Sequence, residues 1–217
     1  MIAAAVAAGI LLPRILVVVL YPLHDFEMHS FKPPFSDPLN PPLHGLFVRA
    51  WHALGQVFDV GLELWWLRLP NLGLSLIFAW LLLRIAREAR HPLAGWAAVG
   101  LFALAPGSIL ISSVQQHYFP EAVAVLWFLE RLQWTLAGPR QVPRSLWLSS
   151  ALCLWTGYVS VFVLAPGLLA VFVVSWRRGM LRTLLLPLAL TILVCVPALY
   201  GGLRGLWEHM QYVWAGQ

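Results

Sequence analysis

The chain contains a succession of long apolar stretches with few charged residues between them. A helix needs about 20 apolar residues to cross the hydrocarbon core of a bilayer. Of the 217 residues, 60% are hydrophobic and 11% are charged, a balance outside the usual range of soluble domains. The pattern therefore predicts an all-α, polytopic membrane bundle of about seven transmembrane helices in one domain, 1–217. The predicted spans are 2–22, 65–83, 92–113, 119–137, 145–158, 160–176 and 183–200, with a terminal outer loop at 201–217.

Nine arginines lie at or near the connections that follow the second, fourth and sixth runs. The stretch 145–176 is too long for one ordinary span, and Gly157 and Tyr158 near its middle allow a tight turn, so it is predicted to form two short helices. If the runs alternate in direction, nine arginines share one side, which is predicted to be cytoplasmic. Most acidic residues gather on the outer side. The nine arginines are Arg84, Arg87, Arg90, Arg131, Arg140, Arg144, Arg177, Arg178 and Arg182.

A long, proline-rich outer loop, 23–64, separates the first two runs. Loops of this length inside a compact protein are usually functional or disordered. Within it, the apolar residues of 44–56 recur at helical spacing, with polar residues between them. This segment is predicted to be an amphipathic helix that lies on the membrane surface or packs as a cap on the bundle. Its apolar positions are Leu46, Phe47, Ala50, Trp51 and Leu54.

The same loop opens with HDFEMH, residues 24–29, directly after the first apolar run. Two interpretations of this cluster are open. It is a solvated polar exit from the membrane, or it is a reactive site, where partial desolvation raises the pKa of a carboxylate and makes it a better proton acceptor. If the first helix continues outward, Asp25 and His29 share one face, and Glu27 points elsewhere.

Four motifs lie in order along the predicted outer side: DFEMH at 25–29, LNPPL at 39–43, PGSILISSVQQHYFPE at 106–121, and RGLWEH at 204–209. Together they resemble the membrane-embedded GT-C glycosyltransferases, and in particular the glucosyltransferases that use dolichyl-phosphate-glucose in the N-glycan pathway. The second motif lacks the acidic residue of the family and is one residue shorter. In the fourth, His209 replaces an aspartate.

That resemblance implies a sugar transfer on the extracytoplasmic face of a plasma, inner or ER-type membrane. A polyprenyl-phosphate-linked sugar is the implied donor, and a hydroxyl of a lipid-linked or glycan acceptor attacks with inversion. Asp25 matches the general base of the family, and Glu27 would hold the acceptor or position the loop. Arg204 is the first candidate to stabilise the departing phosphate, because its fork suits phosphate oxygens, with His29 and His117 behind it. The remaining pocket candidates are Gln116, Glu121 and Glu208.

The resemblance also implies a second half of the enzyme. Members of the family continue into a second half with donor-binding residues, so a further C-terminal half, or a partner chain that completes the enzyme, is expected. Some related enzymes hold a divalent metal, but Asp25 and Glu121 would supply only part of such a site, and no metal or other cofactor is predicted. No nucleic-acid partner is predicted, since the arginines behind the net charge of +5 lie between apolar runs.

Two other functional classes remain open, a non-catalytic membrane subunit and a small transporter. A transporter is expected to place polar residues near the midplane, whereas most acidic residues here lie at the outer ends of the runs. Some candidates also have a purely structural interpretation: Arg204 as an interfacial anchor, and Glu130 with Arg131 as a snorkelling pair. Arg14 lies inside the first run, where it lines the path of the lipid carrier or indicates that the membrane span begins later.

Overall fold

The computed structural model describes residues 2–21, 41–60, 63–114, 117–138 and 142–215. Every regular element within these ranges is an α-helix, so the all-α prediction is confirmed for them. The helices are α1 (Ile2–Leu20), α3 (Pro42–Gln56), α4 (Leu64–Glu88), α5 (Pro92–Leu104), α6 (Pro106–Ser113), α7 (Tyr118–Ala137), α8 (Arg144–Thr156), α9 (Val161–Arg177) and α10 (Leu181–Ala215).

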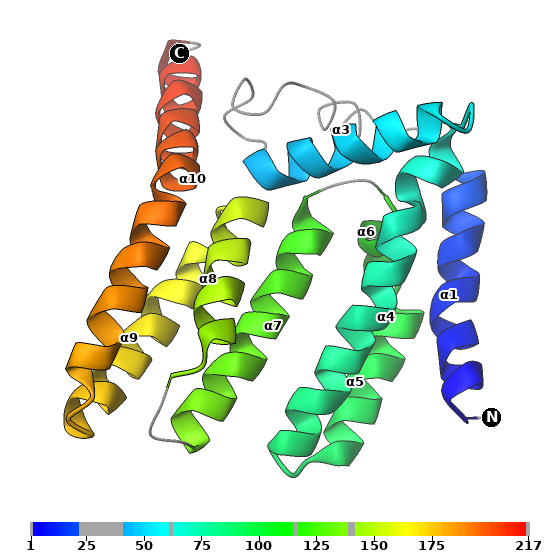
Figure 1. Cartoon of the computed structure of the whole chain (residues 1–217). Helices are drawn as coiled ribbons and strands as arrows, with labels where there is room; N and C mark the ends of the chain where they lie inside the picture. The colour runs from blue at the N-terminus through cyan, green and yellow to red at the C-terminus, as the bar shows by residue number, and fades with distance from the viewer. Residues whose placement is uncertain (1, 22–40, 61–62, 115–116, 139–141, 216–217) are drawn as a thin grey trace.

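The longer helices run side by side and alternate in direction, while α3 lies across one end of them (Figure 1). Helix α7 is central, because it packs against α4 on one side and against α8 on the other. Helix α10 packs on α8 and α9. The N-terminus lies at the end of the bundle away from α3, and the C-terminus lies at the end near it (Figure 1).

Length and apolar composition identify candidate membrane spans in this bundle. Helix α4 qualifies over Leu64–Glu88 and α10 over Leu184–Gly201, and the bent pair α5–α6 makes a third if it counts as one span. Two further apolar helices, Ala4–Leu20 and Val161–Arg177, are shorter. The described residues therefore form a helical protein of membrane character with two or three such spans. That all seven predicted runs cross a bilayer stays a prediction.

Each predicted run coincides with one helix, except that 92–113 forms the bent pair α5–α6. The two helices meet at 71°, and the break falls at Ala105, which has an extended ψ of 122°. Pro106 explains the break, because proline lacks the N–H that would continue the helix and disfavours helical geometry in the residue before it. Residues 145–176 form two helices that meet at Gly157, as predicted.

The terminal segment 201–217, predicted as an outer loop, is instead helical as far as Ala215. After the glycines at 201–202, this segment contains residues with high helix propensity, including leucine, glutamate, methionine and glutamine. Helix α10 therefore continues through this segment and extends past the rest of the bundle (Figure 1).

The helix predicted at 44–56 is present as α3 and begins two residues earlier, at Pro42. A reciprocal pair of tryptophans docks α3 on α4. Nε1 of Trp51 donates to the carbonyl oxygen of Trp66 at 2.8 Å, and Nε1 of Trp66 donates to the carbonyl oxygen of Trp51 at 3.1 Å. The two indole rings stack with their centroids 4.5 Å apart. Helix α3 thus caps the bundle through α4 and α8, while apolar residues such as Leu46 stay exposed on its other side.

The apolar interior is divided into two clusters. The first lies among α1, α4, α5 and the start of α7, and includes Phe102 and Phe119. The second lies among α7, α8, α9 and the start of α10, and includes Phe128, Leu146 and Leu164. Because α7 contributes to both clusters, the boundary between them runs along this helix. The candidate site lies along this boundary.

Candidate functional site

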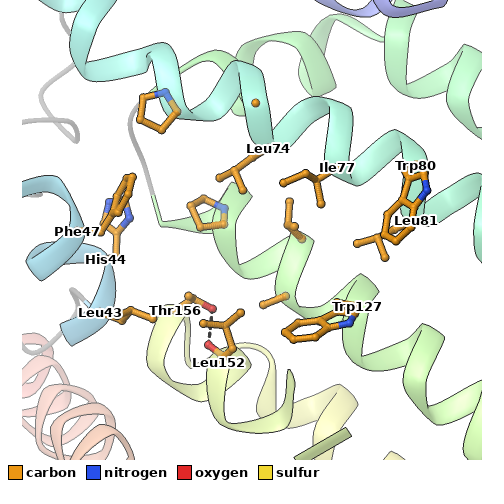
Figure 2. A pocket seen from close by; sticks show the side chains of 15 residues that line it. Leu43, His44, Phe47, Leu74, Ile77, Trp80, Leu81, Trp127, Leu152 and Thr156 are labelled. Atoms are coloured by element: carbon orange, nitrogen blue, oxygen red, sulfur yellow. Dashed lines mark hydrogen bonds between the residues drawn. The ribbon is translucent and has the colours of Figure 1, made fainter. Parts of the chain in front are cut away.

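A groove of about 600 Å³ lies between α4, α7 and α8 and ends against α3 (Figure 2). Its lining is apolar apart from the His44 ring, the Thr156 hydroxyl and two indole N–H groups. The Thr156 hydroxyl donates to the carbonyl oxygen of Leu152 at 2.8 Å, within α8. The lining residues are Leu43, His44 and Phe47 from α3; Pro70, Gly73, Leu74, Ile77, Trp80 and Leu81 from α4; Pro120, Val123, Ala124 and Trp127 from α7; and Leu152 and Thr156 from α8.

The groove is elongated along α4. Its lining there extends from Pro70 to Leu81, about 16 Å at the helical rise per residue, or roughly half of a hydrocarbon core about 30 Å thick. A Cβ added to Gly73 would meet no atom within 4 Å, so the groove has open space at this position. Ile77 and Trp80 are 47% and 53% exposed, so the groove is open along this side of the bundle. An open apolar groove of this length suits a single hydrocarbon chain.

Two histidines lie at the α3 end of the groove. His44 is in the first turn of α3 and is 2% exposed, and His117 immediately precedes α7. Their ring centroids are 6.0 Å apart, in an edge-to-face arrangement. Burial, and secondarily the neighbouring His117, lower the pKa of His44 to about 3, so its imidazole is neutral near neutral pH. In Figure 2, His44 and Phe47 lie at one end of the groove and Trp80 and Trp127 at the other.

Glu121 is in the first turn of α7, and its side chain is buried against the turn between α8 and α9. The backbone N–H of Ser160 donates to Oε1 of Glu121 at 2.6 Å, and Ser160 directly precedes α9, so the carboxylate lies at a helix N-terminus, where negative charge is stabilised. A Cβ on Gly157 would lie 1.9 Å from the carboxyl carbon, so this position must be glycine to admit the carboxylate. Glu121, predicted as a pocket residue, thus joins α7 to this turn and is not among the groove-lining residues.

The other predicted site residues are placed only in part. His117 lies beside His44, while Arg204 is exposed on the far part of α10. Asp25, Glu27, His29 and Gln116 lie outside the described residues, as does the side chain of Glu208 on α10. Their predicted roles stay predictions. Within the described ranges, no three His, Cys, Asp or Glu side chains come together as a metal site would require.

We compared the chain with family models, curated proteins and solved structures. It matches none of them. The likeness to GT-C enzymes therefore rests on the four sequence motifs, and any function has to be argued from the groove and its surroundings.

His44 is the residue of the groove that sequence reasoning missed. The sequence does contain a signal for it: His44 precedes Phe47 by three positions and Trp51 by seven, so it lies on the apolar face of the amphipathic helix. A histidine on such a face is buried when the helix docks. What the sequence did not reveal is that this face closes one end of a groove built by three other helices.

Proposed function

We propose that this protein is a membrane glycosyltransferase that moves a sugar from a polyprenyl-phosphate carrier to an acceptor hydroxyl on the extracytoplasmic face. Asp25 acts as the general base, and the reaction inverts the anomeric carbon. The observation that carries the proposal is the apolar groove between α4 and α7, which suits the hydrocarbon chain of a lipid-linked donor. Sugar carriers of this class combine a long apolar chain with a phosphate, and a site for them needs a chain groove with a polar end.

The polar end of the groove is near the start of the loop that contains the acidic cluster. The chain leaves α1 at Tyr21, whose carbonyl oxygen accepts a hydrogen bond from Nη1 of Arg68 at 2.7 Å. Arg68 is buried on α4, two residues before Pro70, which lines the groove. HDFEMH begins three residues after Tyr21 in the sequence. This connection supports a reaction centre at the α3 end of the groove.

The distribution of charge supports an orientation with that end outside. Seven described arginines, on the last turns of α4, on α7, α8 and α9 and on the turns after α4 and α9, lie toward the end of the bundle opposite α3 (Figure 1), whereas Arg68 lies near the α3 end of α4. Positive residues favour the cytoplasmic side, so we assign α3 and the groove's polar end to the outer side, with all seven runs crossing the membrane. The arginines are Arg84, Arg87, Arg90, Arg131, Arg144, Arg177 and Arg178.

A transfer assay tests the proposal. The native protein in a bilayer, with any partner that copurifies, is given a polyprenyl-phosphate sugar and a lipid-linked acceptor, and product is measured. Asp25→Asn keeps the shape of the side chain but removes the base, so turnover should fall by about a hundredfold or more. Donor binding should change far less, because the base acts on the acceptor. Full activity of Asp25→Asn would refute the role of Asp25, and absence of transfer by the wild type would refute the enzyme assignment.

The second candidate is a non-catalytic subunit that holds a lipid for another protein. The groove supports it equally well, because binding a chain requires no acidic cluster. The transfer assay distinguishes the two candidates. A lipid-holding subunit binds the donor but yields no product on its own, and Asp25→Asn does not change its affinity for the donor.

A further inference from the structure

We infer that His44 and His117 together form the head-group site of the groove and bind the phosphate of the lipid whose chain fills it. This inference deepens the proposed function, on which it rests, because it states where the phosphate of the carrier is held. It gives His44 a role as a specificity-determining residue and pairs it with His117 from a distant part of the chain.

The first support is geometric. His44 lines the groove directly, and its ring lies 6.0 Å from that of His117, between centroids. The two residues come from different segments, α3 and the start of α7, and meet only because α3 lies across the end of the bundle. Two imidazoles at this separation can both donate an N–H to the oxygens of one phosphate between or beside them. The other polar groups of the described lining are the Thr156 hydroxyl, which donates to Leu152, and the indole N–H groups of Trp80 and Trp127 at the opposite end of the groove (Figure 2).

The second support is electrostatic. Among the residues that the structure describes, the groove lining contains no Asp or Glu. The nearby carboxylate of Glu121 is already bound by the backbone N–H of Ser160. His44 also lies in the first turn of α3, a helix of fifteen residues, where backbone N–H groups create a partial positive charge. Among the described residues, a phosphate at this end therefore meets hydrogen-bond donors and no carboxylate in the groove lining.

Direct binding measurements test the inference. The full chain in phosphatidylcholine nanodiscs is titrated with three probes: a short polyprenyl phosphate, the corresponding polyprenol, and inorganic phosphate. The wild type should bind the phosphate lipid at least about tenfold more tightly than the alcohol, the scale of one charge-assisted hydrogen bond, and inorganic phosphate weakly. His44→Phe keeps an aromatic ring but donates no hydrogen bond, so it should reduce the preference for the phosphate lipid several-fold while His117 remains, and leave the affinity for the alcohol unchanged.

Two variants control this result. His52→Phe alters a histidine on the same helix that pairs with Gln56 and does not line the groove, so it should bind all three probes as the wild type does. If His44→Phe also loses binding of the alcohol, its fold is disturbed, and the preference of His117→Phe for the phosphate lipid over the alcohol then decides the question.

The outcomes separate this inference from the proposed function. Equal binding of the phosphate lipid and the alcohol by the wild type, or an unchanged preference in both histidine variants, overturns the inference while the groove remains a chain site. If inorganic phosphate binds as tightly as the phosphate lipid, the inference is also overturned, because the site would then be one for free phosphate. If neither lipid binds, the inference and the proposed function both fail.

Discussion

Nη2 of Arg14 donates a hydrogen bond to the carbonyl oxygen of Phe102 at 2.8 Å. In a continuous helix that carbonyl would accept from the N–H four residues later, but this residue is Pro106, which has no N–H. Arg14 also donates to Ser112 Oγ on α6 at 2.7 Å and to its own helix at Ile10. The buried arginine of the first run therefore binds both halves of the bent pair α5–α6, and it does not line the groove.

The first prediction concerns this bond. Arg14→Met should destabilise the bundle by about 1–3 kcal/mol, the usual penalty for a buried acceptor without a donor. Pro106→Ala restores a backbone N–H at the position that Phe102 needs, so it should be less harmful in the Arg14→Met background than in the wild type. Thermal unfolding in detergent of the two single variants and the double variant measures this coupling. Strictly additive losses would show that Arg14 does not compensate for Pro106.

The second prediction uses the open space at Gly73. Gly73→Leu should fill the groove without a clash, because a Cβ there meets nothing within 4 Å, and so should abolish binding of a polyprenyl chain while the protein stays folded. Gly100→Leu is the matched control: it is also a helical glycine with open space around it, but it does not line the groove. Crosslinking of a photoreactive polyprenol distinguishes them. Equal labelling of the two variants would place the chain elsewhere.

The third prediction concerns the opposite end of the bundle. Glu130, predicted to snorkel with Arg131, is instead fully buried, and it binds Arg131 as well as Arg84 Nε from α4, the latter at 2.8 Å. Glu130→Gln removes the buried counter-charge of two arginines that are themselves partly exposed, so it should destabilise the protein by about 1.5–3 kcal/mol, the scale of a hydrogen bond to a charged group.

The control for Glu130 is Glu88→Gln, which removes a more exposed carboxylate from the same Arg84. Exposed pairs of this spacing contribute only about 0.3–0.5 kcal/mol. Chemical unfolding of both variants in the same detergent compares them. Similar small losses in both would mean that Glu130 is solvated in the folded protein.

The sequence was sufficient to predict the helices but not their side-to-side arrangement. Apolar runs identified the long helices of the described residues except for the second part of α10, and local pattern also identified the turn at Gly157 and the surface helix α3. The bend at Ala105 was not predicted, although the sequence shows Pro106. A proline inside an apolar run is also compatible with a continuous, kinked span. The groove, the His44–His117 pair and the seating of Glu121 depend on contacts between segments far apart in the chain, which a single sequence does not reveal.

The last prediction follows from the burial of His44. Its pKa is about 3 in the folded protein, below the ordinary value of 6.5. Below about pH 6.5, His44 therefore binds a proton when α3 is undocked but stays neutral when α3 is docked. The docking of α3 should be fully stable above that pH and weaken as the pH falls, by about 2 kcal/mol at pH 5.

The Trp51–Trp66 stack reports this docking, because both rings lose their contact when α3 leaves α4. Tryptophan fluorescence and hydrogen exchange of α3 should both change between pH 7 and pH 5, and His44→Asn should remove the pH dependence because the titrating group is gone. His117 is the neighbouring imidazole, so His117→Asn must keep most of the pH effect if His44 is responsible. An α3 that stays equally protected at pH 5 in the wild type would mean that His44 is accessible to protons in the docked state.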